Sequence, residues 1–213
     1  MTDVYRISPD LPDPELIEKA AAVLRGGGLV AYPTETVYGL AAGAFLAEAV
    51  SRVYAAKQRP YNQALPVQIA DRNDVRTLAA DPSAEALRLM DAFFPGPLTI
   101  VFRRPATVSA TVTGGQNTIG IRMPDHPVPL SIIRAFGAPV VCPSANLTGR
   151  RAPMSAADVL EDLDGRIEMI LDAGSTEDRV PSTVIDLSVR PARLLREGKI
   201  TRDELAAFVE IAD

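Results

Sequence analysis

Residues 98–123, LTIVFRRPATVSATVTGGQNTIGIRM, decide the fold class of this chain. They read as two strands, Leu98–Arg103 and Thr118–Met123, joined through a Gly114-Gly115 turn with no helix between them. A purely parallel sheet alternates strands with helices, and this stretch breaks that alternation. The sequence therefore predicts an α/β fold built on a twisted, mixed β-sheet with flanking helices.

The rest of the chain supplies the other elements. Helices are predicted at Glu15–Arg25, Ala47–Lys57, Asn73–Ala79, Pro82–Phe93, Val128–Phe136, Ser155–Leu163 and from Thr201 to about Glu210. Further strands are predicted at Leu29–Tyr32, Leu65–Ala70, Pro139–Cys142, Glu168–Asp172, Thr183–Leu187 and Leu194–Arg196. No repeat and no low-complexity linker interrupts them, so we expect a single domain over residues 1–213 with its core at about 14–210.

Composition excludes several classes of protein. The hydrophobic fraction of 47% predicts a sizeable core, and the single cysteine and single histidine exclude a disulfide framework and a Cys/His metal site. The net charge of −5 argues against stable nucleic-acid binding, which normally needs a basic excess. We expect a cytoplasmic protein, because neither a signal peptide nor a membrane-length apolar segment is found.

The usual sequence signatures of catalysis are missing. No G-x-x-x-x-G-K-[ST] loop, no G-x-G-x-x-G after a strand and no H-E-x-x-H pattern occurs. Cys142 reads as a small buried hydrophobe, and His126 lacks a visible orienting partner, so a structural role is favoured for both. A covalent mechanism therefore has no candidate nucleophile.

Polar residues instead follow predicted strands and helices. PTETVYGL at 33–40 offers Thr34, Thr36 and Tyr38, whose hydroxyls could hold a small zwitterion. The alternative is a capped turn, in which Thr34 caps a short helix and Tyr38 packs inward. Both interpretations stay open at this point.

Two further clusters could bind phosphate. Lys57 and Arg59 sit at a helix end before Pro60, where a cation is also favoured by the helix dipole alone. Ser144 and Asn146 follow the strand Pro139–Cys142, where open α/β sheets bind ligands, although an ordinary Ser/Asn turn would look the same.

Seven motifs, in order along nearly the whole chain, resemble the YrdC/YciO family. They are PTETVYGL (33–40), KQRP (57–60), FPGPLT (94–99), TIGIRMPDHP (118–127), PSANLTG (143–149), PSTVID (181–186) and LLREGKI (194–200). The resemblance implies a YrdC-like fold of the short form, without an extra C-terminal domain. Gln68 departs from the histidine that many members carry, and Gln63 and Ala152 depart from the asparagine and serine that some members carry.

The activity that the resemblance implies is that of a threonylcarbamoyl-AMP synthase, a nucleotidyltransferase that uses L-threonine, bicarbonate or CO2, and ATP in tRNA modification. Lys57, Arg59, Ser144 and Asn146 match the family's catalytic positions around the phosphates. ATP would be bound by Lys57, Arg59, Gln63, Thr118, Ser144, Asn146 and Arg196. L-Threonine would be bound by Thr34, Thr36, Tyr38, Gln68, Arg122 and Ser182.

The same resemblance implies that Mg2+ arrives on the ATP phosphates, with no metal ligands from the protein. A partner could be the transferase that modifies tRNA. Two alternatives stay open. One is an RNA-binding module of the same fold, which the acidic pI of about 5.0 argues against. The other is an enzyme that transfers a carbamoyl or adenylyl group to a different acceptor.

Overall fold

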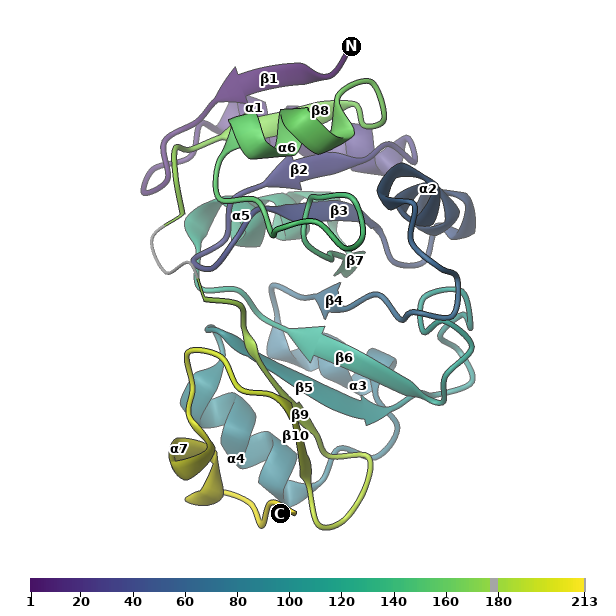
Figure 1. Cartoon of the computed structure of the whole chain (residues 1–213), viewed down its shortest axis with the longest axis vertical. Coiled ribbons are helices and arrows are strands. Elements are labelled where there is room, and N and C mark those ends of the chain that lie inside the picture. The colour runs from purple at the N-terminus through teal and green to yellow at the C-terminus, as the bar shows by residue number, and fades with distance from the viewer. Residues whose placement is uncertain (177–179, 213) are drawn as a thin grey trace.

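The computed structural model describes residues 1–176 and 180–212. Within these residues, ten strands form one twisted sheet in the order β1-β8-β2-β3-β7-β4-β6-β5-β9-β10 (Figure 1). The pairs β1–β8, β2–β8, β4–β6 and β5–β9 are parallel, and the other neighbours are antiparallel. The predicted mixed sheet is confirmed.

The strands are β1 (Asp3–Arg6), β2 (Val30–Tyr32), β3 (Gly39–Gly43), β4 (Val67–Gln68), β5 (Leu98–Arg103), β6 (Thr118–Arg122), β7 (Val140–Val141), β8 (Met169–Asp172), β9 (Thr183–Asp186) and β10 (Arg193–Arg196). The helices are α1 (Pro14–Arg25), α2 (Ala47–Lys57), the 3-10 turn η1 (Arg72–Asp74), α3 (Val75–Leu78), α4 (Ala84–Phe93), α5 (Pro127–Phe136), α6 (Ala156–Leu163) and α7 (Arg202–Ala206).

Local signals explain the ends of several helices. α1 begins after Asp13, whose side chain accepts from the backbone N–H of Glu15, and Pro14 occupies the first helical position. α6 begins with a capping box formed by Ser155 and Asp158. These short polar residues satisfy backbone donors that the first helical turn leaves free.

Three differences from the predicted elements have physical causes. β1 was not predicted, because only scattered residues of this edge strand are apolar. β3 was not predicted either: its sequence, GLAAG, has no β-branched or aromatic residue, and only its burial between β2 and β7 makes it a strand. The helix predicted to reach about Glu210 ends at Ala206, because the chain then turns to pair Ile211 with Ala192.

The sheet divides into two halves. The upper half contains β1, β8, β2, β3 and β7, and the lower half contains β4, β6, β5, β9 and β10 (Figure 1). β7 and β4 have two residues each and pair with each other, and we call this narrow pair the waist. Few backbone groups are therefore paired between the two halves.

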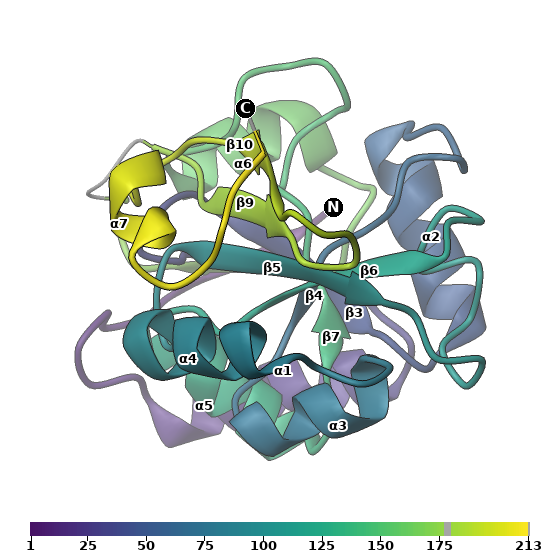
Figure 2. The same ribbon diagram turned by 90° about the horizontal axis from the view of Figure 1, so that it is seen from below.

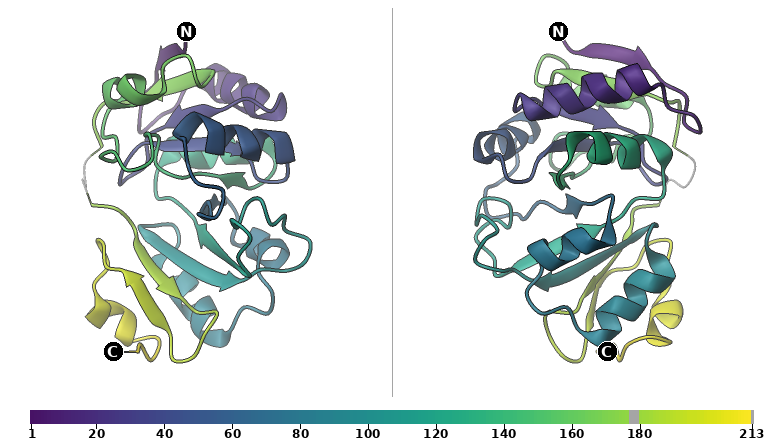
Figure 3. Two further views of the ribbon diagram at one scale, coloured as in Figure 1. Left: turned by 45° about the vertical axis from the view of Figure 1, so that its right-hand side comes forward. Right: turned by 180° about the vertical axis from the view of Figure 1, so that it is seen from behind.

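The helices cover the sheet unevenly. Seen from behind, α1 and α5 lie over the upper half, and α3 and α4 lie over the lower half (Figure 3). Seen from below, α4 and α3 lie on one side of β5, while β9 and β10 lie on the other (Figure 2). α3 and α4 therefore cover one side of the lower half, and α7 lies on the same side of β5 as β9 and β10 (Figure 2).

Among residues 1–176 and 180–212, no helix combines the length and the apolar character that crossing a membrane requires.

Candidate active site

A cavity of about 530 Å3 opens at the waist, between the two halves. This volume lies within the usual range for small-molecule sites. Polar side chains from both halves border it. Those that were predicted as site residues are Thr34, Thr36, Arg59, Gln68, Thr118, Arg122, Ser144, Ser182 and Arg196. Residues separated by up to 162 positions in the chain thus converge on one space.

The turn after β2 is organised by Thr34. Its hydroxyl donates to the carbonyl of Val37 at 2.7 Å and accepts from the backbone N–H groups of Thr36 and Val37, each at 3.2 Å. No helix follows, so the interpretation of Thr34 as a helix cap is wrong. The hydroxyl instead closes a tight turn that holds Thr36 against the cavity.

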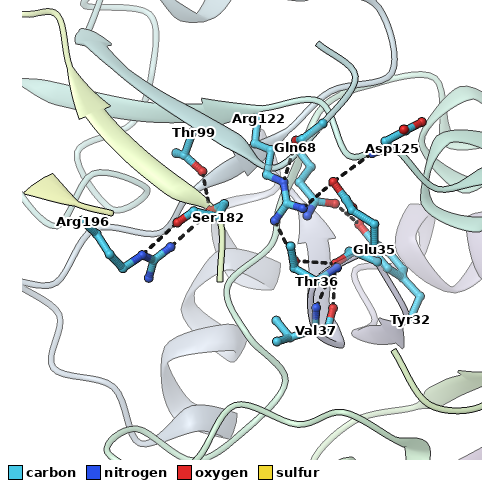
Figure 4. A network of polar contacts seen from close by, with 12 residues as sticks. Tyr32, Glu35, Thr36, Val37, Gln68, Thr99, Arg122, Asp125, Ser182 and Arg196 are labelled. Atoms are coloured by element: carbon cyan, nitrogen blue, oxygen red, sulfur yellow. Dashed lines mark hydrogen bonds and ion pairs between the residues drawn. The ribbon is translucent and has the colours of Figure 1, made fainter. Parts of the chain in front are cut away.

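Arg122, at the end of β6, is held on three sides (Figure 4). Its Nε donates to the carbonyl of Gly96 at 3.2 Å, and its Nη1 donates to Thr36 Oγ1 at 3.1 Å. Its Nη2 lies 2.7 Å from Glu35 Oε1, which also accepts from the backbone N–H of Asp125 at 3.1 Å. The pair joins the two halves, since Glu35 follows β2 and Arg122 ends β6.

Gln68 lies beside Arg122 at the waist. Tyr32 donates its hydroxyl hydrogen to Gln68 Oε1 at 3.0 Å, so the amide nitrogen is the end that can act as a donor toward the cavity. Cys142 also borders the cavity. Burial raises the pKa of its thiol to about 12, which agrees with a small buried hydrophobe and disfavours a nucleophile.

Lys57 ends α2 behind the cavity wall and is only 2% exposed. Its Nζ donates to the carbonyls of Ser144 and Asn146 at 2.5 and 2.7 Å, and to Asn146 Oδ1 at 3.3 Å. Burial, and then the nearby Arg59 charge, lower the pKa of Lys57 to about 7. The three acceptors favour the ammonium form. Lys57 therefore fixes the loop at 143–146.

Ser144 and Asn146 are tied to each other. The Ser144 hydroxyl donates to Asn146 Oδ1 at 2.6 Å, and Asn146 Nδ2 donates to the carbonyl of Arg150 at 2.8 Å. Ser144 borders the cavity, whereas Asn146 and Lys57 stand behind it. Of the residues that the resemblance places around the nucleotide, Ser144 therefore faces the cavity, and Asn146 and Lys57 hold it in position from behind.

Arg59 lies on the loop after α2. The preceding Gln58 adopts a left-handed conformation with φ 50°, which ends the helix. Arg59 Nε donates to the carbonyl of Gln63 at 3.1 Å and Nη2 to that of Ala64 at 2.8 Å. Gln63 therefore contributes its backbone to this arrangement, and its side chain does not border the cavity.

The lower half supplies the opposite wall. Thr99 and Ser182 are joined by a 3.0 Å hydrogen bond between their hydroxyls. Arg196 Nε donates to the Ser182 carbonyl at 2.9 Å, and its Nη2 donates to Ser182 Oγ at 3.1 Å (Figure 4). Thr118 lies further out along β6. Arg196 thus adds a second charge on this side.

Tyr38 does not border the cavity. Its hydroxyl donates to the carbonyl of Gly174 at 2.6 Å and accepts from the backbone N–H of Ala173 at 3.2 Å. Its backbone N–H donates to the carbonyl of Pro153 at 2.9 Å. Tyr38 thus fastens two neighbouring loops behind the turn at 33–37, as the inward-packing alternative predicted.

Some polar residues at the site escaped sequence analysis. Glu35 lies within the PTETVYGL motif, but no role was predicted for it, and none was predicted for Gln116 or Asp186. A signal for Asp186 exists: Ser182, Val184 and Asp186 alternate along β9 and so share one face of the sheet.

The described parts of the chain contain no group of three or more His, Cys, Asp or Glu side chains able to hold a metal ion. Arg59, Arg122 and Arg196 supply the positive charge around the space.

Residues 22–198 match the family model Sua5_yciO_yrdC, whose description is "Telomere recombination". The chain belongs to the Sua5/YciO/YrdC family. It is 45% identical over 198 residues to the threonylcarbamoyl-AMP synthase of Bacillus subtilis, covering 92% of this chain and 57% of that protein. It is 32% identical to a putative threonylcarbamoyl-AMP synthase of Mycobacterium tuberculosis, covering 99% of this chain and 97% of that one.

A solved member of the Sua5/YciO/YrdC family has nearly the same fold. The crystal structure of P. abyssi Sua5 complexed with L-threonine aligns with a TM-score of 0.94 and 40% identity, over 99% of this chain and 63% of that one. The chain thus spans little more than half the length of the Bacillus relative and under two thirds of the P. abyssi protein.

Proposed function

We propose that this protein is a threonylcarbamoyl-AMP synthase, which makes threonylcarbamoyl-AMP and pyrophosphate from L-threonine, bicarbonate or CO2, and ATP. The observation that carries the proposal is the cavity at the waist, where three arginines and several hydroxyls from both halves surround one space. Similarity to curated threonylcarbamoyl-AMP synthases, and to a Sua5 protein complexed with L-threonine, supports it.

The chemistry suits these side chains. The amine of threonine captures CO2 and loses a proton to give a carbamate. A carbamate oxygen then attacks the α-phosphorus of ATP, the bond to the bridging oxygen breaks, and pyrophosphate leaves. Because the substrate is its own nucleophile, the protein has to position two ligands and balance negative charge. Neither carbamate formation nor the attack on the α-phosphorus requires a histidine or cysteine side chain.

The proposed roles follow the layout of the cavity. Arg59, Ser144, Thr118 and Arg196 would contact ATP, with Lys57, Asn146 and the Gln63 backbone holding that wall in place. Thr36, Gln68, Arg122 and Ser182 would contact L-threonine, with Thr34 and Tyr38 shaping the turn behind them. Mg2+ would enter on the phosphates of ATP.

Two broader parts of the proposal rest on sequence and similarity. The product would be consumed by a transferase that modifies tRNA, and the protein would work in the cytoplasm.

Pyrophosphate release tests the proposed activity. We expect the wild-type protein to release pyrophosphate from ATP only when L-threonine and bicarbonate are both present. Arg59→Ala should cost about 2–4 kcal/mol of transition-state stabilisation, and Lys57→Ala should lower the rate by releasing the loop that carries Ser144. Lys19→Ala, a change at an exposed lysine of α1, is the matched control and should leave the rate unchanged. Wild-type rates in both site variants would contradict the assignment.

A second measurement separates the two ends of the cavity. We expect Arg122→Ala to raise the KM for L-threonine more than the KM for ATP. Equal effects on both would remove Arg122 from the amino-acid end. Pyrophosphate release with another amine, and none with threonine, would identify a carbamoyl- or adenylyl-transfer enzyme with a different acceptor.

A further inference from the structure

Asp162 is a buried carboxylate that the proposed reaction does not use. It lies on α6, and its side chain is only 7% exposed. The same helix buries Ala156, Val159 and Leu163 in the core, so packing fixes the helix that carries the carboxylate. A charge at this depth is costly unless hydrogen bonds and an opposite charge compensate it. The partners of Asp162 therefore show what the carboxylate holds in place.

Both oxygens of Asp162 hold one turn of the loop that follows β7. Oδ2 accepts from the backbone N–H of Leu147 at 2.9 Å, and Oδ1 accepts from Arg150 Nη1 at 2.7 Å. Leu147 and Arg150 are the two ends of a β-turn, since the backbone N–H of Arg150 donates to the carbonyl of Leu147 at 3.1 Å. Gly149, the third residue of this turn, has φ 87°, a conformation that favours glycine. Asp162 thus fastens the turn at both of its ends.

The turn in its place orients Asn146. Asn146 Nδ2 donates to the carbonyl of Arg150 at 2.8 Å, so the amide oxygen Oδ1 faces the other way. Oδ1 accepts from Lys57 Nζ at 3.3 Å and from the Ser144 hydroxyl at 2.6 Å. Because an amide oxygen can only accept, the Ser144 hydroxyl is the donor in this contact. The orientation of Ser144 at the cavity wall therefore depends on where the carbonyl of Arg150 lies.

We propose that Asp162 is a positioning residue of the active site: by fixing the turn at 147–150 it orients the Asn146 amide, and through that amide the Ser144 hydroxyl, at the nucleotide end of the cavity. This inference rests on the proposed function and deepens it. Asp162 acts only through the loop, because it does not itself border the cavity. Within residues 1–176 and 180–212, no hydrogen bond joins this turn to Thr36 or Arg122, so the amino-acid end is independent of it.

Two measurements on the whole chain test the inference. The first is steady-state pyrophosphate release with varied ATP, and the second is calorimetric titration with L-threonine alone. Asp162→Asn keeps the shape of the side chain and removes its charge. We expect this variant to lower kcat/KM for ATP by about tenfold, the scale of a hydrogen bond to a charged group. Its affinity for L-threonine should equal that of the wild type.

A double-mutant cycle with Ser144→Ala identifies the route of the effect. Once the Ser144 hydroxyl is removed, Asp162→Asn should have little left to disturb, so the double variant should be about as active as Ser144→Ala alone. A residue that only supports the fold would lower the activity by the same factor in both backgrounds. Glu168→Gln is the matched control, because Glu168 also accepts from a backbone N–H, that of Leu29, and pairs with an arginine, Arg52. Glu168 does not border the cavity, and its replacement should change neither measurement.

Arg150→Met tests the same path at a position where the core is spared. The side chain of Arg150 is 56% exposed, and its loss leaves Asp162 bound to the turn through Leu147 alone. We expect kcat/KM for ATP to fall by about threefold, the scale of a partly exposed ion pair. If Asp162→Asn fails to fold by circular dichroism, Arg150→Met and its combination with Ser144→Ala decide the matter.

The outcomes are distinct. An unchanged kcat/KM for ATP, an equal loss in the wild-type and Ser144→Ala backgrounds, or a weakened affinity for L-threonine would each overturn the inference and leave the proposed function intact. A wild-type protein that releases no pyrophosphate from ATP would contradict the proposed function, and this inference would fall with it.

Discussion

Lys57 places an ammonium group in a buried position behind the cavity, where three oxygen acceptors replace water. Its environment pulls its proton affinity in two directions. Burial and the charge of Arg59 favour the neutral amine and lower the pKa to about 7, whereas the acceptors favour the ammonium. Such a residue should leave a signature in the pH dependence of stability.

We expect the free energy of unfolding to rise with pH above 7 because of Lys57. In the folded protein the pKa of Lys57 is about 7, whereas in the unfolded chain it has its ordinary value of 10.5. Between these two pH values the unfolded chain therefore holds a proton on Lys57 that the folded chain has released. The rise can be at most about 1.4 kcal/mol per pH unit, and the three acceptors make it smaller. Urea unfolding of wild type and Lys57→Met at pH 7, 8 and 9 measures it.

The quantity to follow is the difference in unfolding free energy between wild type and Lys57→Met, because other titrating groups cancel in it. This difference should grow from pH 7 to pH 9. Lys19→Met, at an exposed position of α1, should show no such trend. A constant difference for Lys57→Met would mean that the folded protein keeps the ammonium throughout this range.

At this scale, sequence identified most of the side chains that meet at the cavity and missed what they contact. Arg122 could be predicted as a site residue by resemblance. Its pairing with Glu35 could not, because the two residues are 87 positions apart and come together only through the pairing of strands. Lys57 was predicted to face the phosphates, while its place behind Ser144 depends on the packing of two loops.

Among the elements, β3 and β7 approach each other closely beside the waist. Gly39 begins β3, and a Cβ added there would lie 2.4 Å from Cys142 Sγ. The glycine is thus required by the neighbouring strand, and its own backbone conformation is ordinary. The backbone N–H of Cys142 meanwhile donates to the carbonyl of Pro66 at 2.8 Å, which fixes the backbone that carries the sulfur.

We expect Gly39→Ala to destabilise the protein by about 1–3 kcal/mol through overpacking. Cys142→Ala should remove the clash, so the double variant should be more stable than the sum of the single changes predicts. Urea unfolding of the wild type, both single variants and the double variant completes a double-mutant cycle. Additive effects would show that Gly39 is constrained by something other than the sulfur.

The elements themselves were predictable in proportion to their local signals. α2 and β5 match the predicted bounds, because clear apolar periodicity and a proline break delimit them. β3 is a strand made of glycine, alanine and leucine, whose conformation comes from burial between two neighbours. No short-range rule can detect such a strand.

For the whole molecule, the decisive feature is the junction between the two halves. There the strand pairs β3–β7, β7–β4 and β4–β6 are each only two residues long, and the cavity lies beside them. Cys142 lies at this junction, directly after β7, and is 5% exposed. Modification of its thiol therefore requires a reagent to reach it through the cavity that it borders, or the protein to open locally. The single cysteine makes it a specific probe.

We expect Cys142 to react slowly with an aromatic disulfide reagent at pH 8 in the native protein and quickly in urea. Burial, which raises the thiol pKa to about 12, opposes formation of the reactive thiolate in the native state. Saturating L-threonine and ATP should slow the native reaction by about tenfold or more, because ligands in the cavity cover the thiol that borders it and also disfavour opening. The absorbance of the released thiolate follows the rate.

A native reaction as fast as that of the unfolded chain would contradict the closed junction. A rate unaffected by both ligands would show that opening at Cys142 does not involve the cavity. If ATP with an unrelated amino acid slowed the reaction as much as ATP with L-threonine, the nucleotide alone would account for the protection of Cys142.

At this largest scale, the mixed sheet could be predicted from residues 98–123, because two strands without an intervening helix leave few alternatives. The division into two halves could not. It arises because β4 and β7 have only two residues each, with Pro66 directly before β4 and Pro139 directly before β7 in the chain. The cavity lies beside these two short strands, and no local pattern in the sequence predicts the cavity.

Gly120, in the middle of β6, leaves a strip of bare backbone on the cavity wall between Thr118 and Arg122. A methyl group there would lie 3.3 Å from Thr99 Cγ2 and 3.8 Å from Val101 Cγ2, so alanine can be accommodated with a shift of a few tenths of an ångström. This position is therefore a handle for chemical genetics. Progressively larger side chains at position 120 would give a series of variants with a narrower cavity. The width of any inhibitor could be measured by the variant at which it no longer binds.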